Sequence, residues 1–191
     1  MDIKKPKNMF SLEGIDGAGK STQAPLVKST LQERGYEVKI LKSPDETLLG
    51  KFIRNNVKKI DPWLRNELFL LDIKNSLKKI EDGSETIFLW DRYIDSFYSS
   101  NEEMSLSEAN NLTKNLPKPN KTFLLNINPE TVLKKRKEVL DHHSVPKWLR
   151  QKNERYKELS RIYPDRFSVI DATLPIDKVT QKITNKIIKE V

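Results

Sequence analysis

Near its start the chain reads Gly14-Ile15-Asp16-Gly17-Ala18-Gly19-Lys20-Ser21, followed by Thr22. The stretch is a full match to the phosphate-binding pattern G-x-x-x-x-G-K-[S/T]. Its glycines allow successive backbone N–H groups to turn towards one anion, and the helix that begins near Lys20 would direct its positive dipole end there. Lys20 can reach the β- and γ-phosphates, and the Ser21 hydroxyl can bind Mg²⁺. We therefore expect residues 14–22 to bind the phosphates of a nucleotide together with Mg²⁺.

A chance match in a glycine-rich turn is the simplest alternative for this motif. At the usual glycine content of about 7%, a chain of this length would match by accident on the order of once in a hundred cases. Only six glycines occur in the whole chain, and three of them lie within the motif. The motif also follows an apolar run and precedes a polar, helix-like stretch, which is the context that phosphate binding requires.

Short apolar runs alternate with longer helix-like stretches along the rest of the chain. This alternation predicts an α/β fold in three layers, a five-stranded parallel sheet with helices on both faces. The length of 191 residues favours a single domain, residues 1–191. We expect strands at residues 9–12, 37–41, 86–90, 122–127 and 167–170, and helices at residues 21–34, 47–59, 63–80, 129–140, 146–162 and 175–189.

The apolar run at residues 86–90 ends in Asp91, which Arg92 follows directly. In folds with a phosphate-binding loop, an acidic residue at such a strand end lies beside the magnesium ion, directly or through water. Ligands of open α/β sheets bind at the carboxyl ends of the strands, where a guanidinium can hold a phosphate with two hydrogen bonds. We expect Ser21 and Asp91 to hold the metal and Arg92 to bind phosphate. The alternatives are a cap or turn at the strand end for Asp91 and a surface ion pair for Arg92.

Composition narrows the class of protein without choosing a substrate. The net charge is +8 and the isoelectric point about 9.5, but acidic residues are interleaved with the basic ones, as on a solvated surface. The chain has no cysteine, so disulfides and cysteine-ligated metals are excluded. Neither a secretory leader nor an apolar run long enough to span a bilayer is evident. We expect a cytoplasmic protein that binds neither membranes nor nucleic acid.

Several motifs, in this order, resemble the thymidylate kinase family. The phosphate-binding loop lies within Leu12-Glu13-Gly14 to Thr22-Gln23, and Asp91-Arg92-Tyr93 is similar to the family's Asp-Arg-aromatic motif. Asn128-Pro129-Glu130, Arg155-Tyr156 and the run 169–173 match later parts, so that the resemblance extends over nearly the whole chain. It implies a kinase that transfers the γ-phosphoryl group of ATP to dTMP, and often a homodimer.

Carried over position by position, the resemblance also implies a set of site residues. Arg92 would hold the phosphate of the acceptor, Asp16 would lie near its sugar hydroxyl and the metal, and Phe69 would stack on its base. Ser96 and Ser100 fall at acceptor positions as well. From the residues alone, Phe69 would be taken as helix core.

The family covers ATP with a lid, which we expect around residues 134–151. Some members carry an arginine directly after the position of Asp16, where this chain has Gly17. The resemblance then implies that the lid supplies the catalytic cation. Arg136 and Arg150 are our candidates, although solvated helix charges are an equally good interpretation of either one.

Three departures from the family pattern concern the acceptor. Ile73 stands where the family usually has an arginine, Ser100 replaces an aromatic residue near the sugar, and the segment 42–46 lacks the usual arginine and glycine pair. The acceptor could therefore be dTMP held differently or another nucleoside monophosphate. A non-catalytic nucleotide-binding module is a further alternative. A GTPase is not, because neither Asn-Lys pair continues as Asn-Lys-x-Asp.

Overall fold

The computed structural model describes residues 5–57, 59–80, 85–136 and 146–191. Its centre is a five-stranded parallel sheet with the strand order β2-β3-β1-β4-β5, in which β1 is the middle strand. Among the described residues, no helix is long and apolar enough to cross a membrane. The strands are β1 (Asn8–Glu13), β2 (Val38–Lys42), β3 (Ile87–Asp91), β4 (Lys121–Asn126) and β5 (Phe167–Asp171).

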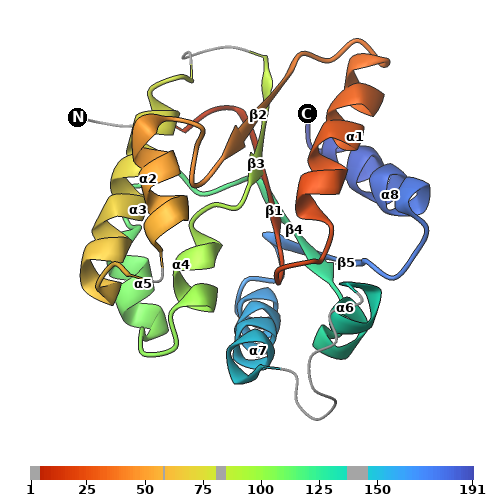
Figure 1. The fold of residues 1–191 in the computed structure, drawn as a ribbon. Helices are drawn as coiled ribbons and strands as arrows, with labels where there is room; N and C mark the ends of the chain where they lie inside the picture. Colours follow the sequence, from red (N-terminus) through yellow and green to blue (C-terminus); the bar gives the residue numbers. More distant parts are fainter. Residues whose placement is uncertain (1–4, 58, 81–84, 137–145) are drawn as a thin grey trace.

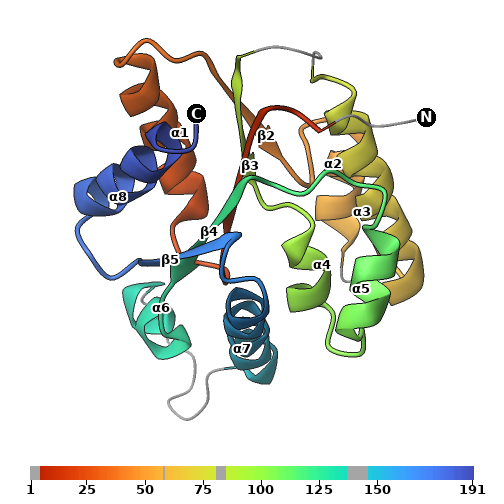
Figure 2. The ribbon, with the colours of Figure 1, turned by 180° about the vertical axis from the view of Figure 1, so that it is seen from behind.

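Helices cover both faces of this sheet. Figure 1 shows α1 and α8 together on one side and α2, α3, α4 and α5 on the other, and the reverse view agrees (Figure 2). Helix α7 packs against α4 and β5, and α6 lies beside α7. The helices are α1 (Lys20–Gln32), α2 (Leu48–Asn56), α3 (Pro62–Leu77), α4 (Asp95–Ser100), α5 (Leu106–Leu112), α6 (Pro129–Arg136), α7 (Lys147–Ile162) and α8 (Ile176–Ile188).

The apolar pattern of each element explains its layer. Every residue of β1 and β3 is buried, as expected for central strands that are covered on both faces. Helix α8 buries Val179, Ile183 and Ile187, which recur every four residues and so form one stripe towards the sheet. The core is therefore continuous from α8 through the sheet to α3 and α4.

The strand order places a reversal at the carboxyl end of β1. From β1 the chain first moves outward to β2, and after β3 it crosses to the other side of β1 to form β4. Ligands of open α/β folds bind at such a reversal, beyond the carboxyl ends of the strands. The phosphate-binding loop, α6 and α7 all lie at this edge, the lower one in Figure 1.

The predicted fold class is confirmed, including the number and parallel arrangement of the strands. Two short helices, α4 and α5, fall in a segment for which no element was predicted. Helix α5 carried a readable signal, because Ser105 and Glu108 form a capping box at its start. The predicted helix at residues 129–140 is described as α6 as far as Arg136, and its remainder lies outside the described residues.

Candidate active site

The loop between β1 and α1 has the conformation that its glycines predict. Gly14, Gly17 and Gly19 have φ values of 140°, 88° and 95°, where side chains are rarely tolerated. At Gly14 a Cβ atom would also lie 2.7 Å from the carbonyl oxygen of Leu125 in β4. The loop can therefore pass close to the neighbouring strand and curl over the carboxyl end of β1 only with glycine at this position.

Lys20, the first residue of α1, folds back across this loop. Its ammonium group donates to the carbonyl oxygens of Gly14 and Ile15, each at 2.8 Å. The side chain is buried, and burial together with the nearby Arg92 lowers the pKa of Lys20 to about 7. A nucleotide phosphate bound next to the ammonium would raise this pKa again and so keep Lys20 positively charged.

Ser21 and Asp91 are adjacent although 70 positions separate them. The Ser21 hydroxyl donates to the carboxylate of Asp91 at 2.7 Å, because α1 begins beside the end of β3. Both side chains offer oxygen, the ligand that Mg²⁺ prefers, and Mg²⁺ usually takes only one or two protein ligands and completes its shell with water and phosphate. No cluster of three acidic or histidine side chains occurs in the described part of the chain. The pair thus fits a magnesium ion that a nucleotide brings with it.

Asp16 is the meeting point of two cations. Arg92 donates to one of its oxygens, and Lys152 of α7 donates to the other at 3.0 Å. Burial alone would raise the pKa of Asp16, but Arg92, Lys152 and Lys20 together lower it to about 2. Arg92 has a φ of 71°, an uncommon value for a residue other than glycine, and its guanidinium also approaches the carbonyl of Gly14 at 3.4 Å. Asp16 is therefore ionised at neutral pH and holds both cations.

A cavity of about 340 Å³ opens next to this cluster. One wall is apolar and contains Phe69 and Phe97, whose ring centroids are 6.4 Å apart at an interplanar angle of 76°. The cavity has the size and the mixed character of a small-molecule site. Its lining consists of Asp16, Ser43, Pro44, Val57, Arg65, Asn66, Phe69, Ile73, Arg92, Tyr93, Ser96, Phe97, Ser100, Asn101 and Lys152.

The sequence comparisons agree with this geometry. A family model described as thymidylate kinase matches residues 12–183, which is most of the chain and runs from the end of β1 into α8. The chain belongs to the thymidylate kinase family. The resemblance predicted from the motifs is thereby confirmed.

Relatives of this thymidylate kinase family member occur in archaea and in a vertebrate. A protein named probable thymidylate kinase from Archaeoglobus fulgidus is 30% identical, and the match covers 92% of both chains. One of the same name from Methanosphaera stadtmanae is 31% identical over 93% of this chain and 96% of its own. The thymidylate kinase of Danio rerio is 28% identical over 92% of this chain and 87% of its own. The family relationship thus extends over nearly the full length of each protein.

Most of the predicted site residues lie together in this family member. The phosphate-binding loop meets Ser21 and Asp91 on one side, and Asp16 and Arg92 border the cavity on the other. Phe69, Ser96 and Ser100 line the cavity, as the resemblance implied. Ile73, which is 1% exposed, lines the cavity as well. It puts an apolar surface at the position where the resemblance implied an arginine.

The two predicted lid cations are placed differently from the rest of the site. Arg150 forms an ion pair with Glu130 at 3.2 Å and borders a separate hollow between α6 and α7. It does not line the cavity beside Asp16. The backbone of Arg136 ends α6, but its side chain and residues 137–145 of the predicted lid lie outside the described residues. A catalytic role for either arginine stays a prediction.

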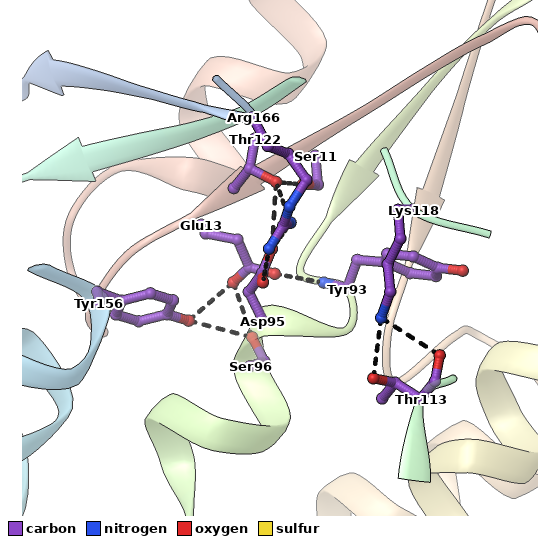
Figure 3. Close-up of polar contacts among 10 residues, drawn as sticks. All are labelled: Ser11, Glu13, Tyr93, Asp95, Ser96, Thr113, Lys118, Thr122, Tyr156 and Arg166. Atoms are coloured by element: carbon purple, nitrogen blue, oxygen red, sulfur yellow. Dashed lines mark hydrogen bonds and ion pairs between the residues drawn. The ribbon is translucent and has the colours of Figure 1, made fainter. Parts of the chain in front are cut away.

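Three site residues were missed from the sequence. Lys152 lies one helical turn before Tyr156 on α7, so that helical spacing could have placed both on one face. Arg65 lies one turn before Phe69 on α3 and lines the same cavity. Glu13, a single acidic residue in the otherwise uncharged run of β1, is fully buried, and Tyr156 and Ser96 turn towards its carboxylate (Figure 3).

Proposed function

We propose that the chain transfers the γ-phosphoryl group of ATP to dTMP and forms dTDP, with Mg²⁺ bound alongside ATP. One observation carries the proposal. The phosphate-binding loop and the cavity share a border at Asp16 and Arg92, so that a nucleotide on the loop and a monophosphate in the cavity would meet there. Family membership supports the same reaction, since the relatives are named thymidylate kinases.

On the donor side, the loop N–H groups and the start of α1 would hold the phosphates of ATP. Lys20 would exchange its contacts with the loop carbonyls for the β- and γ-phosphates, and Ser21 with Asp91 would hold the metal ion. When bound, Mg²⁺ neutralises charge on the transferring group and on the leaving diphosphate. The chain's own contribution is to position these groups and to keep the loop rigid.

On the acceptor side, charge and shape both favour a nucleoside monophosphate. Three cations, Arg65, Arg92 and Lys152, and one carboxylate, Asp16, line the cavity. Their excess of positive charge suits the phosphate monoester, which carries close to two negative charges at neutral pH. The apolar wall around Phe69 suits a planar base, because aromatic rings stack on or pack edge-on to such a ring.

In the proposed reaction, an oxygen of the acceptor phosphate attacks the γ-phosphorus of ATP. A bond forms between that oxygen and the γ-phosphorus, the bond from the γ-phosphorus to the β,γ-bridging oxygen breaks, and ADP leaves with the electron pair. Negative charge spreads over the equatorial oxygens during the transfer, so cations held nearby lower the barrier. Lys20, Arg92 and Lys152 are the cations that surround this point.

A second acceptor is favoured by one observation, the apolar part of the cavity lining. Ile73 and Phe97 offer no hydrogen bond to a base, so this part alone would not select thymine over another base. The deciding experiment measures ADP release with Mg·ATP against a panel of ribo- and deoxynucleoside monophosphates. Fastest turnover with dTMP supports the proposal, whereas fastest turnover with another monophosphate replaces the acceptor. ATP binding without any turnover would instead favour a non-catalytic module.

We also propose that the chain forms a homodimer through α2 and α3. Leu48 and Trp63 are 88% and 70% exposed, and Phe52, Leu64 and Leu71 add further exposed apolar surface on the same two helices. An apolar surface of this kind usually marks a protein interface. Sedimentation of the wild-type chain and of Leu71→Glu would test it, and a wild-type monomer would refute it. Activity in the cytoplasm stays a prediction.

A further inference from the structure

Glu13, the last residue of β1, has no exposed surface, and its carboxylate accepts hydrogen bonds from neutral donors alone. The Tyr93 backbone N–H lies at 2.7 Å, the Ser96 hydroxyl at 2.8 Å and the Tyr156 hydroxyl at 2.7 Å. Burial, together with the nearby Asp95, raises the pKa of Glu13 to about 7. A buried carboxylate without a contacting cation costs stability relative to a well-packed apolar side chain. The fold therefore keeps Glu13 at a cost.

The three donors come from parts of the chain that also supply the cations around Asp16. Tyr93 directly follows Arg92, which has a positive φ and donates to Asp16. Tyr156 lies on α7 one turn after Lys152, and the two side chains project from the same face of that helix. The carboxylate of Glu13 thus holds Tyr93, which follows Arg92, and Tyr156 on α7, the helix that carries Lys152. Figure 3 shows both hydrogen bonds.

Tyr156 is well suited to hold α7 in a fixed position relative to Glu13. Its ring is fully buried, and burial raises its pKa, so that the hydroxyl remains a donor to Glu13 at neutral pH. Helix α7 also follows the segment 137–145 of the predicted lid in sequence. A hydrogen bond from a buried, rigid side chain to the central strand limits how far α7 can rotate or slide. Such rotation would move Lys152, four residues earlier, away from Asp16.

We propose that Glu13 is a positioning residue of the acceptor site, which acts through Tyr156 to hold Lys152 on Asp16 and through the Tyr93 N–H to hold Arg92 there. The inference rests on the proposed function in so far as these two cations bind the acceptor phosphate. Its structural part, the link from Glu13 to Lys152, can be measured without any substrate.

The test compares Tyr156→Phe with a matched control, Tyr98→Phe. Tyr98 of α4 also donates its hydroxyl to a carboxylate across the α4–α7 contact, that of Glu158 at 2.5 Å, but it does not line the acceptor cavity. Each variant removes one hydroxyl and keeps the ring. If Glu13 acts as proposed, Tyr156→Phe weakens dTMP binding about 10-fold, as expected for a lost contact of about 1.4 kcal/mol, and leaves the KM for ATP unchanged. Tyr98→Phe should change dTMP binding less than about 2-fold.

A double variant distinguishes positioning from packing. In Lys152→Met the phosphate contact is lost and most of the side-chain stem is kept. If Tyr156 acts through Lys152, adding Tyr156→Phe to Lys152→Met weakens dTMP binding little further, so that the two effects are not additive. Additive losses would overturn the proposal. An equal loss in Tyr98→Phe would overturn it as well, because any α4–α7 contact would then serve.

The substrate-free measurement is the acylation rate of Lys152 in the unliganded protein, followed by mass spectrometry. Lys152 is 8% exposed and paired with Asp16, so we expect slow labelling in the wild type and in Tyr98→Phe, and several-fold faster labelling in Tyr156→Phe. Equal labelling in all three proteins would refute the link from Glu13 to Lys152. Faster labelling combined with no dTMP binding by the wild type would instead refute the proposed acceptor and leave the link intact.

Discussion

The donor loop and the acceptor cavity of this protein are built in opposite ways. Nine consecutive residues, 14–22, form the loop, and their conformation follows from three glycines and the start of one helix. The cavity is assembled from Asp16 of that loop, the segments after β2 and β3, and the helices α3, α4 and α7, which are far apart in the sequence. A local motif can be recognised from its residues, whereas a site made of distant elements depends on how the whole chain packs. Substitutions at single residues can therefore separate the two regions or measure how strongly they are joined.

The largest effect is expected at the donor loop. Lys20→Ala should lower kcat by roughly 10²–10³-fold, because it removes the cation that meets the transferring phosphoryl group. The thermal midpoint should stay the same or rise, since a buried ammonium is lost. Steady-state assays and thermal unfolding of the same preparation would show both. Wild-type activity in a folded Lys20→Ala protein would contradict the assignment of the loop.

Glu13 should make the free energy of unfolding depend on pH. Its pKa is raised from 4.5 in the unfolded chain to about 7, so the folded state binds the extra proton between these values. The resulting stabilisation is present below about pH 4.5 and is lost as the pH rises through 7, by up to about 3 kcal/mol. Urea unfolding at several pH values should show this fall in the wild type, and Glu13→Gln should lack this contribution. An identical pH dependence in both proteins would count against it.

Arg92 lies at the border between the donor loop and the acceptor cavity, so a substitution there should affect the two ligands differently. Arg92→Ala should weaken dTMP binding about 10- to 100-fold, as expected for one or two charge-assisted hydrogen bonds, and should change ATP binding far less. Calorimetric titrations with dTMP and with a non-hydrolysable ATP analogue would measure both affinities. Equal losses for the two ligands would mean that Arg92 supports the shared structure and does not select the acceptor.

The smallest effect is expected at Arg65, which lines the cavity from α3. Its side chain has no hydrogen-bond or ion-pair partner among the residues that the structure describes, so it is available to an anionic ligand. Arg65→Ala should raise the KM for dTMP about 10-fold or less and leave the KM for ATP unchanged.

Lys74→Ala is the matched control for Arg65, because Lys74 is exposed on the same helix and does not line the cavity. Thymidine, which lacks the phosphate, should inhibit the wild type and Arg65→Ala equally. A loss of thymidine affinity in Arg65→Ala would place this arginine against the nucleoside and away from the phosphate.

The strands, the phosphate-binding loop and the positions of Ser21 and Asp91 could be predicted because each has a local cause. Alternating apolar runs mark the strands, and Asp91 and Arg92 follow directly from a strand end. Helix α4 could not be predicted in the same way. It is only six residues long, and its burial comes from contact with α7, some 50 residues later in the chain. Short helices of this kind depend on tertiary packing more than on their own sequence.

The cations of the acceptor site show where reasoning from sequence ends. Arg150 and Lys152 lie two residues apart on α7, and both are basic. Two residues on a helix are about 200° apart around its axis, so only one of them can face Asp16. In the structure, Lys152 pairs with Asp16 and Arg150 pairs with Glu130. The rotation of α7 that decides this is set by Tyr156 and its partners, which a one-dimensional pattern does not reveal.

The double pairing of Asp16 has a consequence for selectivity among anions. Arg92 and Lys152 each already hold one oxygen of its carboxylate, so any entering anion competes with a ligand that is attached to the site itself. A small monoanion such as chloride gains too little from either cation to displace that carboxylate. In the proposed function, a phosphate monoester would engage both cations, because it carries more charge and more oxygens than chloride, and Asp16 would then be free to turn to a hydroxyl. We therefore expect the cluster to bind a phosphorylated sugar in preference to the salt ions around it.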